Sequence, residues 1–197
     1  MIKYQTELGT AAQDITNDDD FTREHVKDFL RLDLACGQRK KEGFLGVDRE
    51  KIEGVDIVHD LTQYPWPFED SSVYEIHCSH YVEHVVDLVS FMNECYRILK
   101  PLGVMTIYCP YYSSERAWQD PTHVRAITMN TFRYFDRQWA KDIVMDHYMG
   151  KCDFEVVSVV PLINNEWKGR ADEAIQWAMK HYINVVDDLQ VVLRKRG

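Results

Sequence analysis

Three aspartates lie in or directly after short apolar segments in the first third of the chain. Asp33 lies within Arg-Leu-Asp-Leu-Ala-Cys-Gly, Asp48 ends Gly-Val-Asp, and Asp60 ends Asp-Ile-Val-His-Asp. Carboxylates at the carboxyl ends of neighbouring parallel strands can accept hydrogen bonds from the hydroxyl and amino groups of a nucleoside. We therefore predict that these acids form a nucleoside-binding edge of a sheet. The simpler alternative is that Asp33 and Asp60 only cap turns.

The turn after the first apolar segment narrows the choice of ligand. A dinucleotide site uses three glycines, Gly-x-Gly-x-x-Gly, so that a pyrophosphate can approach the backbone at a helix N-terminus. Here the run reads Ala35-Cys36-Gly37-Gln38-Arg39-Lys40 and keeps one glycine of the three. This pattern disfavours NAD and favours a nucleoside cofactor that has no pyrophosphate.

Hydrophobic periodicity predicts the elements that would position these residues. Only 48 − 33 = 15 residues separate Asp33 from Asp48, which leaves little room for a helix between the first two strands. We predict an α/β, three-layer Rossmann-like sheet, parallel with an antiparallel last strand, and a first helix that is short or absent. The predicted strands are 32–36, 44–47, 56–60, 73–78, 104–109, 154–160 and 189–194, and the clearest helices are 85–99 and 171–182.

Composition indicates one globular domain in a reducing cytoplasm. The chain has 197 residues, a hydrophobic fraction of 45%, and five cysteines that form no Cys-x-x-Cys pair. No apolar run is long enough to span a membrane. The net charge of −9 disfavours nucleic acid as a partner, because phosphate binding usually needs a basic face. The sequence leaves the oligomeric state open.

Two segments stand apart from this domain. Residues 1–30 are polar and acidic and are predicted to form an N-terminal arm, with the globular domain over 31–197. Residues 111–148 are rich in aromatic and charged side chains and follow a strand. Such an insert suits a substrate wall, although a pair of helices packed on the sheet explains the aromatic residues equally well.

Taken together, the motifs resemble the class I S-adenosylmethionine-dependent methyltransferases, in a compact form with a shortened first helix. The matching runs are Leu-Asp-Leu-Ala-Cys-Gly, Gly-Val-Asp, His-Asp-Leu, Pro-Phe-Glu-Asp-Ser-Ser-Val-Tyr-Glu-Ile, His-Tyr-Val-Glu-His-Val, Cys-Tyr-Arg-Ile-Leu-Lys-Pro-Leu-Gly and His-Val-Arg-Ala-Ile-Thr. The resemblance covers roughly residues 30 to 195. It departs from the family at Ala35 and Arg39, where glycines are usual.

The resemblance implies a cofactor, S-adenosyl-L-methionine, and a set of contacts to it. Asp48 would accept from the ribose hydroxyls and Asp60 from the adenine amino group. The full implied set, from the methionine end to the adenine end, is Asp33, Ala35, Gly37, Ser79, Asp48, Asp60 and Leu61.

Methyl transfer from a sulfonium needs positioning more than a fixed catalytic triad. An oxygen or nitrogen acceptor still benefits from a base, which makes His80 and His123 the candidates, with Asp120 or Arg125 as orienting residues. For His123, a loop residue that bonds a helix start is an equally good interpretation. His77, His80 and His84 could suggest a metal cluster, but His77 and His80 fall on different elements and Glu83-His84 is ordinary for the family that the motifs resemble, so no metal site is predicted.

Three functions remain open from the sequence. The preferred one is transfer of a methyl group to an O or N atom of a small molecule or glycan. A cofactor-binding regulatory protein without transferase activity is the alternative. A nucleic-acid methyltransferase is disfavoured, because Cys78-Ser79-His80-Tyr81 stands where an Asn/Asp-Pro-Pro-Tyr run is usual.

Overall fold

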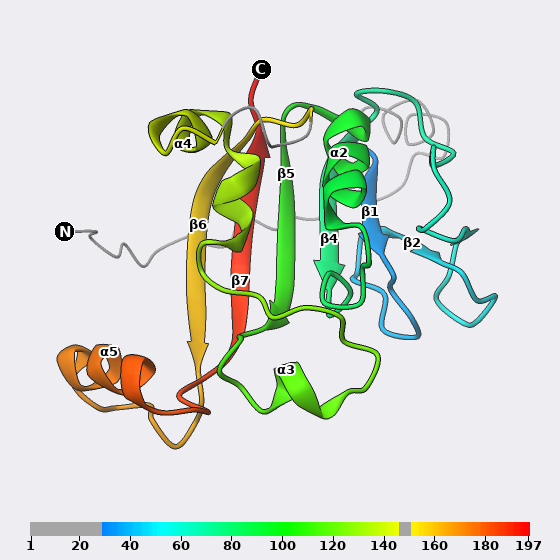
Figure 1. Cartoon of the computed structure of the whole chain (residues 1–197). Coiled ribbons are helices and arrows are strands. Elements are labelled where there is room, and N and C mark those ends of the chain that lie inside the picture. Colours follow the sequence, from blue (N-terminus) through cyan, green and yellow to red (C-terminus); the bar gives the residue numbers. More distant parts are fainter. Residues whose placement is uncertain (1–28, 146–150) are drawn as a thin grey trace, which may run out of the picture.

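The computed structural model describes residues 29–145 and 151–197 and contains one seven-stranded sheet (Figure 1). The strand order is β3-β2-β1-β4-β5-β7-β6. Neighbouring strands from β3 to β5 pair in parallel, whereas β7 pairs antiparallel with both β5 and β6. The strands are β1 (Arg31–Leu34), β2 (Leu45–Asp48), β3 (Ile57–Val58), β4 (Val73–Ser79), β5 (Leu99–Pro110), β6 (Phe154–Ile163) and β7 (Val186–Lys195). This topology confirms the predicted Rossmann-like class and the antiparallel last strand.

Strand order reverses between β1 and β4, which lie side by side in the middle of the sheet. Asp33 of β1 is level with His77 of β4 in the parallel register. In open α/β sheets, ligands bind beyond the carboxyl ends of the strands at such a reversal. That edge of the sheet is the lower one in Figure 1.

No helix separates β1 from β2, as the short spacing predicted. The connecting loop and the loop that follows β2 pack directly on the strand instead. A Cβ atom on Gly46 would lie 2.6 Å from the backbone oxygen of Gly54 and 2.7 Å from Cys36 Sγ. Only glycine fits where these two loops meet the strand.

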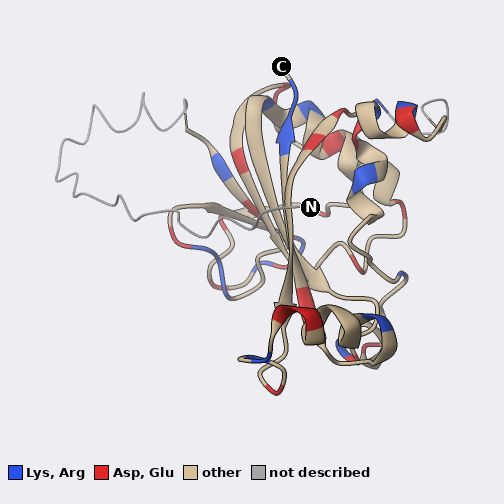
Figure 2. Ribbon diagram, turned by 90° about the vertical axis from the view of Figure 1, so that its left-hand side faces the viewer, with Lys and Arg blue, Asp and Glu red and all other residues tan. Residues whose placement is uncertain are grey.

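One face of the central strands is buried, and α2 (Leu88–Ile98) packs on that side of the sheet (Figure 2). On β4 and β5, alternate residues such as Ile76, Cys78, Met105 and Ile107 have no exposed surface. Asp87 caps the start of the helix by accepting from Ser90 N. At its other end the chain enters β5 directly at Leu99, earlier than the predicted strand start at residue 104.

The aromatic segment 111–148 divides into two parts. Residues up to about 127 cross the carboxyl edge of the sheet and include α3 (Arg116–Gln119), at the bottom of Figure 1. The 3-10 helix η1 (Thr131–Phe135) and α4 (Arg137–Asp142) then return along the sheet toward its other end. Phe132 and Phe135 are buried there, so this second part packs on the sheet as a pair of helices would. A substrate wall formed by the first part stays a prediction.

The β6–β7 connection carries α5 (Asp172–His181), which extends beyond the sheet and buries only Ala178. Most of the predicted N-terminal arm, residues 1–28, lies outside the described residues. Among the described helices, none has the length and apolar character needed to cross a bilayer.

Candidate active site

Two adjoining cavities lie at the carboxyl ends of the central strands. One has a volume of about 460 Å³ and includes Ala35, Asp48, Asp60, Leu61 and His80 in its wall. The other has a volume of about 610 Å³. Its wall includes Asp33, Gly37 and Ser79, and it shares Ala35 and His80 with the first cavity. All seven residues of the implied cofactor set therefore line one continuous groove.

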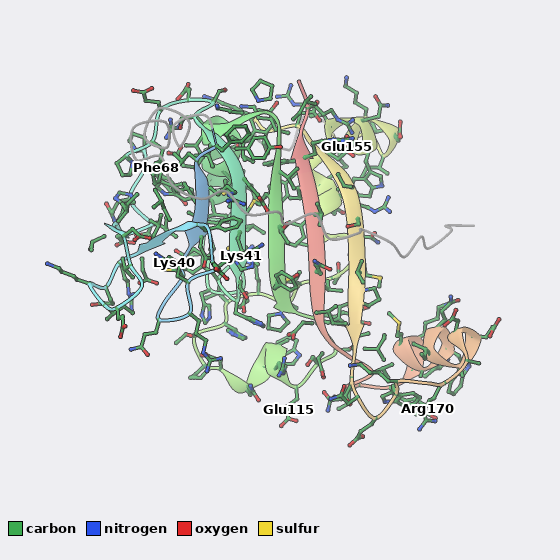
Figure 3. The ribbon with its side chains drawn as sticks, turned by 180° about the vertical axis from the view of Figure 1, so that it is seen from behind. Lys40, Lys41, Phe68, Glu115, Glu155 and Arg170 are labelled. Carbon is green, nitrogen blue, oxygen red and sulfur yellow. The ribbon has the colours of Figure 1, made fainter. Side chains whose placement is uncertain are left out.

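Asp33 is only 2% exposed, and both its carboxylate oxygens have protein partners. Oδ1 lies 2.7 Å from His77 Nδ1, and Oδ2 accepts from the backbone N–H of Lys41 at 2.7 Å. Figure 3 shows Lys40 and Lys41 in the loop beside β1 and β2. Asp33 therefore holds this loop against the strand, as a turn cap would, and each oxygen keeps a lone pair toward the groove.

The pairing of His77 with Asp33 is not among the predictions from the sequence. A signal for it exists, because β1 and β4 are neighbours in this strand order and both residues lie one or two positions before the strand ends.

The turn after β1 is built from left-handed backbone. Ala35 has φ 54° and Gly37 has φ 53°. This conformation directs the N–H of Gly37 to Asp48 Oδ2 at 2.9 Å, and the N–H of Glu50 reaches Asp48 Oδ1 at 3.2 Å. A carboxylate oxygen can accept two hydrogen bonds, so both oxygens of Asp48 retain one lone pair for a pair of vicinal hydroxyls.

Asp60 closes a tight turn after β3. Its Oδ1 accepts from both the backbone N–H and the hydroxyl of Thr62, at 2.9 and 2.8 Å. These bonds lower the pKa of the Asp60 carboxyl, so it stays ionised at neutral pH. Next to it, the buried Leu61 is held by its carbonyl, which accepts from Trp66 Nε1 at 3.1 Å.

His80 follows Ser79, the last residue of β4, and also has left-handed backbone, with φ 54°. Its N–H donates to the carbonyl of Tyr108 at 2.8 Å, which fixes the turn to β5. The side chain is 47% exposed, and its Nδ1 lies 3.4 Å from Glu83 Oε1. The Glu83 carboxylate raises the pKa of His80. Strained backbone of this kind is concentrated at functional sites.

Tyr81 lines the same cavity wall as His80. Burial raises the pKa of Tyr81 to about 12. The phenol therefore stays protonated at neutral pH and is able to donate a hydrogen bond into the groove.

His123 lies behind this wall, with its side chain 9% exposed. Its Nδ1 donates to the carbonyl of Ala117 at 3.1 Å, and its Nε2 lies 4.0 Å from Glu83 Oε1. The residues around it bind the turn after β4: the N–H of Val124 reaches the carbonyl of Glu83, and Arg125 donates to the carbonyls of Val85 and Val86. The Asp120 carboxylate bonds Thr122. Arg125 therefore binds the turn after β4 and Asp120 binds Thr122, and neither side chain orients the ring of His123.

Comparison with known proteins agrees with this architecture. Residues 21–107 match a family described as a methyltransferase domain. No curated protein sequence matches the chain.

Three solved structures are similar over most of the chain. A S-adenosylmethionine-dependent methyltransferase from Archaeoglobus fulgidus has TM-score 0.60 and 19% identity, over 90% of this chain and 95% of that one. The complex of the Haloferax volcanii Trm112 methyltransferase activator with a putative methyltransferase gives TM-score 0.54 and 16% identity, over 89% of each chain. The [4+2]-cyclase SpnF gives TM-score 0.53 and 15% identity, over 90% of this chain and 81% of that one.

The chain has the class I S-adenosylmethionine-dependent methyltransferase fold, which confirms the resemblance carried by its motifs. The chemistry of the groove fits S-adenosylmethionine, the cofactor that the resemblance implies. The groove offers carboxylates at both ends and a single-glycine turn that needs no phosphate contact.

Proposed function

We propose that this protein is a cytoplasmic enzyme that transfers the methyl group of S-adenosylmethionine to an O or N atom of a small molecule or glycan. The observation that carries the proposal is the junction of the two cavities. Asp48, Asp60 and Leu61 suit the adenosine end, whereas Asp33, Gly37 and Ser79 suit the methionine end. Ala35 and His80 lie where both cavities meet, between the two ends.

When bound, S-adenosylmethionine supplies a methyl group already activated on a sulfonium. The chain then has to align an acceptor in line with that methyl group and exclude competing water. His80 is the candidate base, because its half-exposed imidazole reaches the junction. The nearly buried His123 has one ring nitrogen bound to Ala117 and is less suited to receive a proton from an acceptor. Residues 111–127, which cross the same edge, would form the acceptor side.

Calorimetric titration with S-adenosylhomocysteine tests the cofactor site. We expect saturable one-to-one binding that Asp48→Asn weakens by about 10- to 100-fold, because hydrogen bonds to a charged acceptor contribute about 1.5–3 kcal/mol. Asp172→Asn, an exposed acid in the first turn of α5, is the matched control and should leave the affinity unchanged. Absence of binding by the native protein would refute the proposal.

A second function, cofactor binding without methyl transfer, is favoured by one specific observation. The chain is similar in fold to SpnF, a [4+2]-cyclase, so this fold carries chemistry other than methyl transfer. Release of S-adenosylhomocysteine from S-adenosylmethionine over a panel of hydroxyl- and amine-bearing acceptors separates the two functions. Binding with no release over a broad panel would favour the second. Retardation of a nucleic acid in a gel at moderate salt would instead favour a nucleic-acid acceptor.

A further inference from the structure

Glu83 is a buried carboxylate that makes no hydrogen bond to any described residue, and one charged neighbour is the half-exposed His80, whose Nδ1 lies 3.4 Å from Glu83 Oε1. Glu83 lies in the turn after β4 with its side chain 2% exposed. Both of its carboxylate oxygens are buried, and neither has a hydrogen-bond partner in the described structure. A buried carboxylate without hydrogen bonds is costly, by several kcal/mol, unless a cation compensates it.

Two further histidines, His84 and His123, present nitrogen atoms near this carboxylate. The hydroxyl of Thr122 donates to Asp120 Oδ1 at 2.6 Å, so it accepts from His84 Nδ1 at 2.9 Å. This leaves His84 Nε2 as an unprotonated nitrogen in the neutral ring. His123 has the same arrangement, because its Nδ1 donates to the carbonyl of Ala117. A metal-binding histidine characteristically donates its second ring N–H to a nearby oxygen in this way.

The three side chains converge on a small volume. Donor atoms of Glu83, His84 and His123, one from each residue, all lie within 4.8 Å of one another. His123 Nε2 and Glu83 Oε1 are 4.0 Å apart, and the rings of the two histidines are 4.6 Å apart at their centres. Ligand atoms around a tetrahedral zinc ion are separated by about 3.3 Å, so side-chain shifts of roughly 1 Å would complete the site.

We propose that Glu83, His84 and His123 bind a divalent transition-metal ion of the Zn²⁺ type. Two imidazole nitrogens and one carboxylate suit such an ion, whereas Mg²⁺ and Ca²⁺ prefer oxygen ligands. Three protein ligands leave at least one coordination position open. His84 and Thr122 line the cavity that also contains Asp48 and Asp60, so the ion lies at the wall of the candidate active site.

The role of this ion rests on the proposed function. At this wall it would bind and polarise a hydroxyl or amine of the acceptor, next to His80. The sequence predicts no metal site at His77, His80 and His84, and Glu83-His84 is ordinary for the family that the motifs resemble. Glu83 and His123 lie 123 − 83 = 40 residues apart in the sequence and are brought together only by the path of residues 111–127.

Zinc titration of the full-length, tag-free, chelator-treated protein tests the site by calorimetry, with Co²⁺ absorption as a second readout. We expect one ion per chain and visible d–d bands typical of nitrogen and oxygen ligands. Glu83→Gln, His84→Gln and His123→Gln should each weaken Zn²⁺ binding at least tenfold. His181→Gln, an exposed histidine on α5, is the matched control and should bind Zn²⁺ like the native protein.

Thermal unfolding of each metal-free variant establishes that it is folded, and any variant that is not folded is replaced by the asparagine substitution at the same position. Absence of one-to-one binding by the native protein, or unchanged affinity in the folded His84 and His123 variants, would overturn the metal site. S-adenosylhomocysteine titration of the metal-free native protein is the independent measurement. If it binds while Zn²⁺ does not, only the metal site fails, and if neither binds, the proposed function fails as well.

Discussion

His80 is the residue on which the proposed chemistry depends most, and its backbone limits the choice of test. An alanine at φ 54° would add strain, whereas asparagine tolerates left-handed backbone well. We expect His80→Asn to lower kcat for a responsive acceptor by about 10²- to 10⁴-fold, the usual contribution of a general base. The affinity for S-adenosylhomocysteine should stay within about threefold, since His80 is not expected to bind the cofactor through its ring.

Steady-state kinetics and calorimetry on the same preparation check this prediction. His181→Gln serves as the control for a histidine outside the groove. A His80→Asn enzyme with native kcat would show that positioning alone drives the transfer.

The left-handed backbone of Ala35, in the turn after β1, leads to a prediction about stability. Left-handed backbone costs an alanine about 1–2 kcal/mol, and glycine avoids this cost. Glycine also has more conformational freedom in the unfolded chain, which offsets about 0.5–1 kcal/mol of the gain. We therefore expect Ala35→Gly to stabilise the protein by up to ~1 kcal/mol, measured by urea unfolding. Ala178→Gly, in right-handed backbone on α5, is the control and should destabilise by about 1 kcal/mol. Equal destabilisation by both variants would contradict the role of the left-handed turn.

Residue types at strand ends were enough to predict the groove. Asp33, Asp48 and Asp60 could be placed because parallel strands present their carboxyl ends at one edge. The cluster of Glu83, His84 and His123 could not, because its members come together only through a segment whose path has no periodic signal. Polar contacts made by loops depend on the whole fold, whereas strand periodicity is local.

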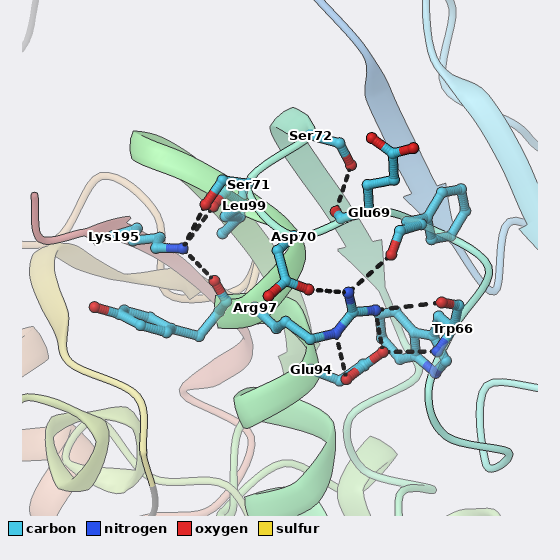
Figure 4. A network of polar contacts seen from close by, with 11 residues as sticks. Trp66, Glu69, Asp70, Ser71, Ser72, Glu94, Arg97, Leu99 and Lys195 are labelled. Carbon is cyan, nitrogen blue, oxygen red and sulfur yellow. Dashed lines mark hydrogen bonds and ion pairs between the residues drawn. The ribbon is translucent and has the colours of Figure 1, made fainter.

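At the scale of elements, Arg97 fastens the loop before β4 to α2 (Figure 4). Its guanidinium donates to both oxygens of Glu94, at 2.6 and 3.0 Å. It also donates to Asp70 and to the carbonyls of Trp66 and Phe68. Glu94 in turn accepts from the backbone N–H of Trp66 at 2.6 Å. The Glu94–Arg97 pair thus satisfies three backbone groups of the loop, which are the N–H and carbonyl of Trp66 and the carbonyl of Phe68.

We expect Arg97→Met to lower the free energy of unfolding by about 3 kcal/mol, because it leaves the largely buried Glu94 without its charged partner. Arg194→Met removes a more exposed ion pair with Glu155 and is the matched control, with an expected loss below about 1 kcal/mol. Urea unfolding at neutral pH measures both. Similar losses in the two variants would show that the burial of Glu94 does not increase the cost of removing its charged partner.

The same pair sets an acid limit on stability. Burial raises the pKa of Glu94, but Arg97 and the Trp66 N–H outweigh it, and the net pKa is lowered from 4.5. A carboxyl whose folded pKa is depressed stabilises the protein above its unfolded pKa, and this contribution is lost as the pH falls through the folded value. The difference between native and Arg97→Met protein should therefore shrink below about pH 4, measured by urea unfolding across pH. A constant difference down to pH 3 would contradict this linkage.

Elements were easier to predict than their ends and their faces. The 3.6-residue period of residues 85–99 predicted α2, which the structure has at Leu88–Ile98. The start of β5 at Leu99 was not predicted, because Pro101 and Gly103 look like a turn. Residues 111–148 look uniform in composition, but Phe132 and Phe135 anchor one part to the sheet while residues near α3 cross its edge. Composition predicts that aromatic side chains are buried, but it does not predict which surface they pack against.

At the scale of the whole molecule, the groove lies beside tightly packed strands, whereas α5 packs loosely. The groove joins β1, β2 and β4, whose core residues have no exposed surface, whereas α5 buries only Ala178. Exposed aromatic residues near α5 stack mainly on one another, as Trp177 does on His181. Ligand binding at the groove should therefore stabilise one region without changing local opening in the other.

Amide hydrogen exchange with and without S-adenosylhomocysteine measures this difference. At a ligand concentration 100 times Kd, binding stabilises the folded state by about 2.7 kcal/mol. Amides that exchange by local opening in residues 35–41, 59–62 and 79–84 should slow markedly, because the ligand bridges these three loops. Amides of residues 164–182 that open locally should exchange at the same rate with and without ligand. Protection centred on 164–182 would place the ligand elsewhere. Asp48→Asn, with its expected 10- to 100-fold lower affinity, should weaken the protection at the same ligand concentration, because binding then stabilises the folded state by only about 0.4–1.4 kcal/mol.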